Sequence, residues 1–218
     1  MTKLKICGLR DVGHAVVAAD AGADFLGFVF VTGVPRQLTR EQAMIIIEKY
    51  RREISSGGPL LVGLFANQPL DEVNTIVRAC GLDQVQLCGS ELPEYCQGVT
   101  VPIIQQVKVH VDRASKELKD DTLRRVDEVV ASHQKPLLDR HETGFLGGTG
   151  RTFDWDIARH VSEHHDIFLA GGLTINNVSE AIQKVDPWGV DVSSGVETEG
   201  VKDRGKIEQF TREVHMVD

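Results

Sequence analysis

Short apolar runs and amphipathic stretches alternate along this chain. The apolar runs predict eight strands: Lys3–Cys7, Phe25–Phe30, Leu60–Phe65, Gln84–Leu87, Ile103–Val107, Pro136–Asp139, Ile167–Ala170 and Gly189–Val192. Runs that are apolar throughout, rather than at every second position, are typical of parallel strands that are covered on both faces.

Helix signals fill the intervals between these runs. Thr39-Arg40-Glu41-Gln42 opens one helix with a capping-box pattern, and Pro69-Leu70-Asp71-Glu72 opens another with a proline and early acids. The remaining predicted helices are Asp11–Ala21, a short segment near Glu91–Gln97, Asp112–Ala131, Asp154–His165, Thr174–Val185 and Asp203–His215.

Eight successive strand–helix units favour a closed barrel over an open sheet. We therefore expect an α/β protein with the (β/α)8 TIM-barrel fold, in which residues 1–218 form one catalytic domain. Ser55–Pro59 is interpreted as a turn between a helix and a strand, since the sequence shows no linker between domains. The Gly-x-Gly-x-x-Gly pattern of dinucleotide folds does not follow the first strand.

Composition and charge narrow the function class. The chain has 218 residues, 41% of them hydrophobic, and a formal net charge of -8, which argues against a surface for nucleic acid or anionic membranes. No apolar run approaches the roughly 18 residues of a membrane span, and the first residues do not resemble a signal peptide. We expect a cytoplasmic protein, either a monomer or a homodimer. Its four cysteines contain no Cys-x-x-Cys pair and are expected to be free thiols.

Reactive side chains stand at the carboxyl ends of predicted strands, where TIM barrels carry their active sites. Cys7 ends the first strand, and the period of two places Lys5 on the same inward face, where its charge would favour a thiolate. Asp139 abruptly ends the sixth apolar strand. Asp191, in the eighth strand, is predicted to face inward and pair with Lys5, with a substrate-binding or helper role toward substrate as the alternative. The alternatives are an inert thiol at Cys7 and a loop-capping role for Asp139.

Two glycine-rich turns and one arginine suggest an anionic ligand. Gly171-Gly172 and Ser193-Ser194-Gly195 follow the seventh and eighth strands, where TIM barrels often bind phosphate. Backbone N–H groups at such turns favour an anion. Pro35 restrains the backbone before Arg36, whose guanidinium at the rim is suited to a carboxylate. A solvated surface arginine is the alternative.

Two further segments were weighed for function. The connection Arg140–Arg151 is long for a strand-to-helix loop and is predicted to be a lid or a binding loop. His160-Val161-Ser162-Glu163-His164 matches a metalloprotease pattern, but it lies on a helix that is expected to face away from the barrel. We therefore predict no metal site.

The motifs taken together resemble those of the phosphoribosylanthranilate isomerases of tryptophan biosynthesis. The resemblance covers nearly the whole chain, and it rests on Lys5-Ile6-Cys7-Gly8-Leu9, Pro35-Arg36, Val62-Gly63-Leu64-Phe65, Val85-Gln86-Leu87, Gly147-Gly148-Thr149-Gly150-Arg151-Thr152-Phe153-Asp154-Trp155, Leu169-Ala170-Gly171-Gly172-Leu173 and Asp191-Val192-Ser193-Ser194-Gly195-Val196-Glu197.

This resemblance implies an Amadori rearrangement of phosphoribosylanthranilate without a cofactor or a metal. It assigns Cys7 as the general base, Asp139 as the general acid and Arg36 as the contact of the anthranilate carboxylate, with the two glycine-rich turns as the phosphate cradle. The sequence departs from the family pattern in two places. Cys88 replaces a histidine that is usual after Val-Gln-Leu, and Val31-Thr32-Gly33-Val34 is less polar than expected.

Two rival functions were considered. An aldose–ketose isomerase of the histidine pathway is expected to carry aspartates on its first and fifth strands, where this chain has Cys7 and no acid within Ile103–Val107. A barrel that only binds phosphate would keep the glycine-rich turns but would not need both Cys7 and Asp139.

Overall fold

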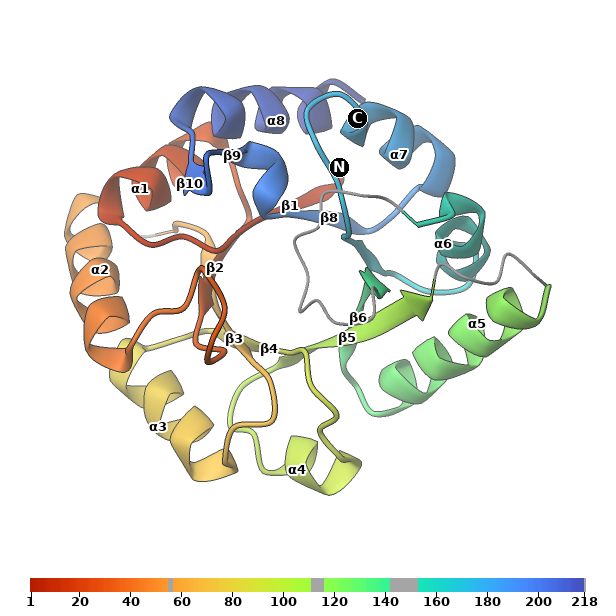
Figure 1. The fold of residues 1–218 in the computed structure, drawn as a ribbon, viewed down its shortest axis with the longest axis horizontal. Helices are drawn as coiled ribbons and strands as arrows, with labels where there is room; N and C mark the ends of the chain where they lie inside the picture. The colour runs from red at the N-terminus through yellow and green to blue at the C-terminus, as the bar shows by residue number, and fades with distance from the viewer. Residues whose placement is uncertain (55–56, 111–115, 142–152, 218) are drawn as a thin grey trace.

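The computed structural model describes residues 1–54, 57–110, 116–141 and 153–217. Its eight parallel strands close into one barrel in chain order, with β8 returning to pair with β1, and helices surround the barrel (Figure 1). The barrel strands are β1 (Lys3–Cys7), β2 (Phe25–Val29), β3 (Leu60–Phe65), β4 (Gln84–Leu87), β5 (Ile103–His110), β6 (Lys135–His141), β7 (Phe168–Leu169) and β8 (Gly189–Val192). The predicted TIM-barrel fold is confirmed.

The helices alternate with these strands as the sequence predicts. They are α1 (Val12–Ala21), α2 (Arg40–Glu53), α3 (Leu70–Cys80), α4 (Pro93–Gln97), α5 (Lys116–Ala131), α6 (Trp155–Ser162), α7 (Val178–Val185) and α8 (Arg204–Val217). The capping box predicted at Thr39 is present, because the Thr39 side chain accepts from the Gln42 N–H and Gln42 bonds back to the Thr39 N–H.

Element boundaries differ most around the sixth and seventh strands. The seventh strand covers only Phe168–Leu169, whereas β5 and β6 pair further than the apolar pattern indicated, through Lys108 opposite Asp139 and beyond. The paired neighbouring strand satisfies the backbone N–H and C=O groups of these polar residues, so the strands extend past the apolar run. The helix predicted from residue 112 begins at Lys116 within the described residues, and the predicted turn at 55–59 lies partly outside them.

Two apolar clusters hold the fold together. The larger lies between the barrel and its helices, and the smaller fills the barrel interior with Cys7, Phe25, Val29, Val62, Leu64, Ile104, Leu137, Phe168 and Ala170. Such double burial explains why the strand sequences read as continuous apolar runs. No helix among the described residues is long and apolar enough to cross a membrane.

A small hairpin follows β8 and lies at the edge of the barrel, next to α8 and α1 (Figure 1). It consists of a short 3₁₀ helix, η1 (Ser194–Val196), and two strands, β9 (Glu197–Thr198) and β10 (Val201–Lys202) (Figure 1). The sequence reasoning did not predict this hairpin. It matters for function because it brings Glu197 and Lys202 beside the ends of β1 and β2.

Candidate active site

Lys5 and Asp191 form a buried ion pair beneath Cys7. Register places Lys5 opposite Asp191 on neighbouring strands, and Lys5 Nζ lies 2.9 Å from Asp191 Oδ1. The Lys5 side chain is fully buried and Asp191 is nearly so, which confirms the predicted pair. Gly27 makes room for it, because a Cβ there would lie 3.0 Å from Cys7 Sγ and 3.2 Å from Lys5 Nζ.

The charge balance at Cys7 differs from the sequence prediction. Burial raises the pKa of the Cys7 thiol and outweighs the Lys5 charge, which by itself favours the thiolate as expected. Burial also acts to lower the pKa of Lys5, but the charges of Asp191 and Cys7 overcome it and raise that pKa. Lys5 favours the thiolate as expected, but the net shift of the Cys7 pKa is upward because burial opposes Lys5 and is the larger effect, with the Asp191 charge adding to it.

Asp139 lies at the carboxyl end of β6 with one oxygen held. Gln106 of β5 donates a 2.6 Å hydrogen bond from Nε2 to Asp139 Oδ2, while a Cβ on Gly171 would lie 2.9 Å from Oδ1. Burial, assisted by the charge of Asp191, raises the pKa of Asp139 to about 6. The predicted direction is confirmed, although its main cause is burial rather than a neighbouring thiolate or phosphate.

Cys7 and Asp139 act on a common set of groups. Negative charge on Cys7 and on Asp139 acts to raise the pKa of the Cys88 thiol, which follows β4. The Asp191 charge acts to raise the pKa of both Cys7 and Asp139. Cys7 ends β1 and Asp139 lies near the end of β6, so the closed parallel barrel brings the base and acid candidates to the same end of the barrel. A group that takes a proton and a group that gives one are thus brought together.

The two glycine-rich turns, which are predicted to bind phosphate, lie against each other. Gly171 and Gly172 have φ of 83° and 78°, which strongly favours glycine. Gly195 sits so close to the preceding loop that a Cβ would come 1.9 Å from the carbonyl oxygen of Leu173. Ser193, just before η1, donates its hydroxyl to the carbonyl of Cys7, which ties the second turn to the end of β1.

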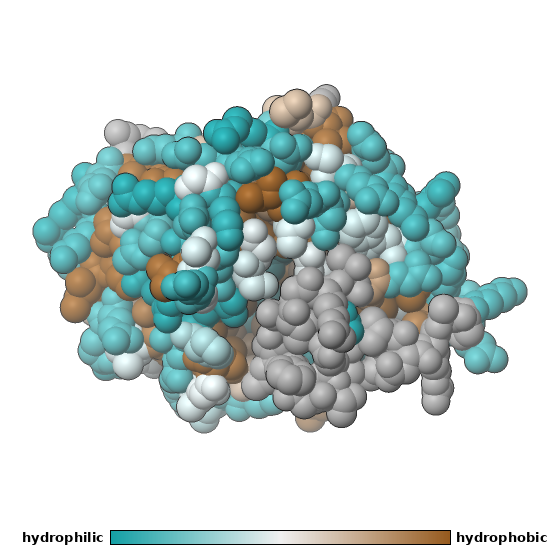
Figure 2. Space-filling view, turned by 45° about the horizontal axis from the view of Figure 1, so that its top comes forward, coloured by the Kyte–Doolittle hydropathy of each residue, from teal (hydrophilic) through white to brown (hydrophobic). Residues whose placement is uncertain are grey.

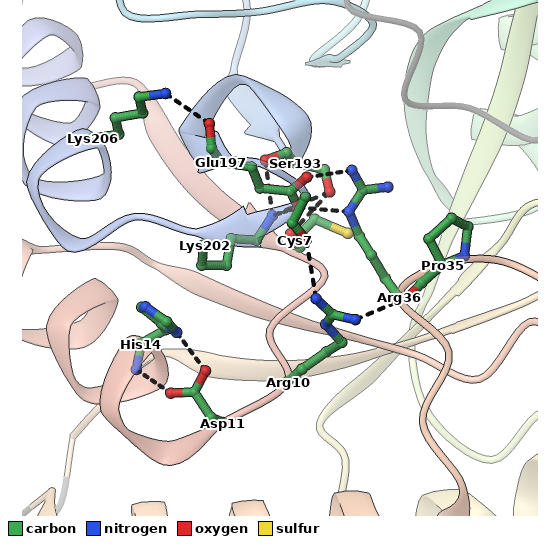
Figure 3. Close-up of polar contacts among 11 residues, drawn as sticks. Cys7, Arg10, Asp11, His14, Pro35, Arg36, Ser193, Glu197, Lys202 and Lys206 are labelled. Carbon is green, nitrogen blue, oxygen red and sulfur yellow. Dashed lines mark hydrogen bonds and ion pairs between the residues drawn. The ribbon is translucent and has the colours of Figure 1, made fainter.

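Arg36 reaches the same mouth but is held by an acid that the sequence analysis did not single out. Its Nε and Nη2 donate to the two carboxylate oxygens of Glu197 at 2.7 and 2.6 Å (Figure 3). The side chain runs over Gly8, where a Cβ would come 2.4 Å from Arg36 Cδ. Glu197 is buried and also accepts from Lys202 Nζ at 2.7 Å. The alternative of a solvated surface arginine is therefore wrong.

Glu197, Lys202 and Gln106 are the site residues that the sequence analysis missed. Glu197 is the last residue of the family-like motif Asp191–Glu197, and its position two residues after Gly195 was the available signal. Lys202 is nearly buried and also donates to the Ser193 carbonyl at 2.8 Å. Nothing in the sequence separates it from the surface lysines around it.

Apolar side chains line the interior below this rim. Val31, Val34 and Cys88 pack against the interior cluster and supply an apolar wall. Burial raises the pKa of Cys88 to about 12, so its thiol is neutral. The four cysteines are free thiols, as predicted.

Two predicted features remain, the metalloprotease-like pattern at residues 160–164 and the long connection Arg140–Arg151. Among the described residues, His, Cys, Asp and Glu side chains form no cluster that is suited to a metal ion. His160 on α6 and His164, just after that helix, pack edge to face, and α6 lies outside the barrel (Figure 1). Most of the connection Arg140–Arg151, with the Gly147–Arg151 part of the quoted motif, lies outside the described residues.

Comparisons with known proteins agree across the full length of the chain. The sequence model of the family described as N-(5'phosphoribosyl)anthranilate (PRA) isomerase matches residues 4–213. A protein of Dehalococcoides mccartyi named N-(5'-phosphoribosyl)anthranilate isomerase is 41% identical over 218 residues, covering 100% of this chain and 98% of its own. The crystal structure of phosphoribosyl anthranilate isomerase from Thermotoga maritima is 29% identical, with a TM-score of 0.83 over 99% of this chain and 100% of that one. A further such isomerase, solved in complex with reduced 1-(o-carboxyphenylamino)-1-deoxyribulose 5-phosphate, is 28% identical with a TM-score of 0.80 over the same shares.

Proposed function

Because the chain belongs to the N-(5'-phosphoribosyl)anthranilate isomerase family, we propose that Cys7 and Asp139 are the base and the acid of its reaction. The enzyme catalyses an Amadori rearrangement in tryptophan biosynthesis. In this reaction N-(5-phosphoribosyl)anthranilate becomes 1-(2-carboxyphenylamino)-1-deoxyribulose 5-phosphate, an aminoaldose turned into an aminoketose.

The first step opens the sugar ring. Protonated Asp139 gives its proton to the furanose oxygen while the C1–O bond breaks, and the anthranilate nitrogen takes up the positive charge as a Schiff base. A pKa of about 6 keeps enough of the carboxyl protonated near neutral pH for this task. An aspartate at its ordinary pKa near 3.9 would be almost wholly ionised there.

The second step moves the hydrogen that makes the reaction an isomerisation. The Cys7 thiolate removes the proton from ribose C2, the electron pair flows toward the cationic nitrogen, and the resulting enolamine tautomerises to the ketone. Asp139 has then lost one proton and Cys7 has gained one. Transfer between them, directly or through solvent, restores the starting state.

Cys7 and Asp139 share one proton in two alternative states. The active state, with a Cys7 thiolate and a protonated Asp139, is the less populated of the two. With the pKa of Cys7 raised and that of Asp139 near 6, the free enzyme holds mostly thiol and carboxylate. Coupled groups of this kind titrate as a pair. The cation that forms on the Schiff base favours the thiolate only once the ring has opened, so the base is strengthened at the step that uses it.

Separate groups at the mouth of the barrel are proposed to bind the two anionic ends of the substrate. The turns at Gly171-Gly172 and Ser193-Ser194-Gly195 would bind the phosphate through backbone N–H groups, and Arg36 would bind the anthranilate carboxylate. The aromatic ring fits the apolar wall at Val31, Val34 and Cys88. Locally clustered cations, Arg36 and Lys202, would let an acidic chain attract an anionic substrate.

Two broader expectations from the sequence are also proposed. A single catalytic domain over residues 1–218 is supported by the fact that one chain supplies all eight barrel strands. A cytoplasmic location is supported by membership in a family of amino-acid biosynthesis enzymes. Figure 2 shows that hydrophilic residues predominate on the visible face, with hydrophobic residues in separate patches.

The rival functions lack supporting residues. An isomerase with paired aspartates on its first and fifth strands is disfavoured, because β1 ends in Cys7 and β5 presents Gln106 toward Asp139. A binding module without catalysis would have no use for an aspartate with a raised pKa beside a buried thiol.

The proposal is tested by following the loss of phosphoribosylanthranilate fluorescence. Wild type, Cys7→Ala and Asp139→Asn are compared, with circular dichroism as the check on folding. We expect turnover by wild type and a loss of at least about 100-fold in kcat for each folded variant, the usual scale of acid–base catalysis. Equal activity in all three would overturn the assignment of roles.

A further inference from the structure

The bidentate pair of Arg36 and Glu197 joins two loops that are far apart in sequence. Arg36 follows β2, and Glu197 begins β9 after the turn proposed to bind phosphate. Nε and Nη2 of Arg36 are both occupied by Glu197, so the guanidinium is fixed in plane as well as in position. Figure 3 shows Nη1 on the edge that points away from Glu197.

Lys202 adds a second positive charge to the pair of Arg36 and Glu197. Its Nζ donates to Glu197 Oε1, so one carboxylate is shared by two cations and the cluster keeps a net positive charge. Both hydrogen bonds hold Glu197 ionised, lowering its pKa to about 2 against the effect of burial. Glu197 therefore orients Arg36 without cancelling the charge that an anionic substrate needs.

We propose that Glu197 is a positioning residue, which holds the guanidinium of Arg36 so that its free edge meets the carboxylate on the aromatic ring of the substrate. This inference rests on the proposed function, in which Arg36 contacts that carboxylate. It adds a residue that never touches the substrate yet sets affinity for one chemical group of it.

The hydrogen bonds between Glu197 and Arg36 also allow the opposite interpretation, that Glu197 hinders substrate binding. The experiment distinguishes the two. If Glu197 competed with the substrate carboxylate for Arg36, removing its charge would tighten binding. If Glu197 positions Arg36, removing its charge weakens binding, because the free guanidinium must then lose side-chain entropy when the ligand binds.

The test measures inhibition constants, so that catalysis by Cys7 and Asp139 does not enter. The probes are reduced 1-(o-carboxyphenylamino)-1-deoxyribulose 5-phosphate and the same molecule without its carboxyl group. For Glu197→Gln we expect the inhibition constant of the first probe to rise about tenfold, the scale of one charge-assisted contact, and that of the second to change less than about twofold. Glu197→Asp, which keeps the charge on a shorter side chain, should show a smaller rise.

Controls separate failure of this inference from failure of the proposed function. Arg36→Met should abolish the preference for the carboxylated probe; if it does not, the carboxylate contact itself is wrong. If Arg36→Met abolishes the preference while both folded Glu197 variants keep it at the wild-type level, only the positioning role is overturned. Tighter binding in Glu197→Gln would overturn it in favour of competition. Glu128→Gln, which breaks an exposed pair with Arg124 on α5, should change neither constant.

Discussion

Gln106 donates a 2.6 Å hydrogen bond to Oδ2 of Asp139 across the neighbouring strands β5 and β6. Donation from the amide N–H favours the ionised form of Asp139 and holds the carboxyl against Gly171, where a Cβ would lie 2.9 Å from Oδ1.

Loss of the Gln106 amide should move the acidic limb of the pH–rate profile upward. The hydrogen bond favours the charged form of Asp139, so Gln106→Met should raise the Asp139 pKa above about 6. The proposed mechanism requires protonated Asp139 and ionised Cys7, which predicts a bell whose acidic limb follows the lower of the two pKa values, that of Asp139. The measurement is kcat/KM from pH 5 to 9.

The matched control for this prediction is Gln105→Met, one position earlier on β5, where alternation turns the side chain to the other face. It should leave the limb in place. A flat wild-type profile over this range, with chemistry limiting, would contradict the acid–base pair itself.

Neutralising Asp139 should stabilise the folded protein at neutral pH. The folded pKa is raised from 3.8 to about 6, so the folded state binds more protons than the unfolded state within that window. Stability is therefore lost as pH rises through it. Asp139→Asn should unfold at a higher temperature than wild type at pH 7.5, and the gap should close by pH 3.5. Asp120→Asn, at an exposed position on α5, should show no such dependence.

The ion pair of Lys5 and Asp191 was predictable from sequence, whereas the pair of Arg36 and Glu197 was not. Strand alternation puts Lys5 and Cys7 on one face, and barrel closure brings the eighth strand to the first, so Asp191 follows. Arg36 and Glu197 lie 161 residues apart, on a loop and a hairpin that have no hydrophobic period to place them. Long-range pairing between irregular segments leaves no trace in local sequence.

The sequence also did not show how deeply the side chains of the site are buried. The chain shows that Lys5 is near Cys7, but not that the thiol is nearly inaccessible or that Asp191 lies 2.9 Å from Lys5. Burial is the main reason that the pKa of Cys7 shifts upward rather than downward, and the charge of Asp191 adds to it. For Asp139 the sign was right because burial and neighbouring negative charge both act to raise its pKa.

Lys5→Met should destabilise the barrel far more than an equivalent change at its surface. It would leave the Asp191 carboxylate buried without its partner, which typically costs about 3–5 kcal/mol. Lys3→Met on the same strand breaks the pair with Asp24, in which both side chains are substantially exposed, and should cost about 1 kcal/mol or less. Urea unfolding of both variants measures the difference, and similar costs would show that the buried pair is not a special contributor.

Gly195→Ala should damage phosphate binding specifically. A Cβ there would lie 1.9 Å from the Leu173 carbonyl oxygen, a backbone atom that cannot move aside alone, so the loops after β7 and β8 must separate. Because those two loops are proposed to bind one phosphate together, we expect the inhibition constant of inorganic phosphate to rise about tenfold or more. Gly205→Ala in α8, where the nearest atom would be 3.4 Å away, should leave phosphate binding unchanged. Unaltered phosphate inhibition in a folded Gly195→Ala protein would place the phosphate elsewhere on the barrel.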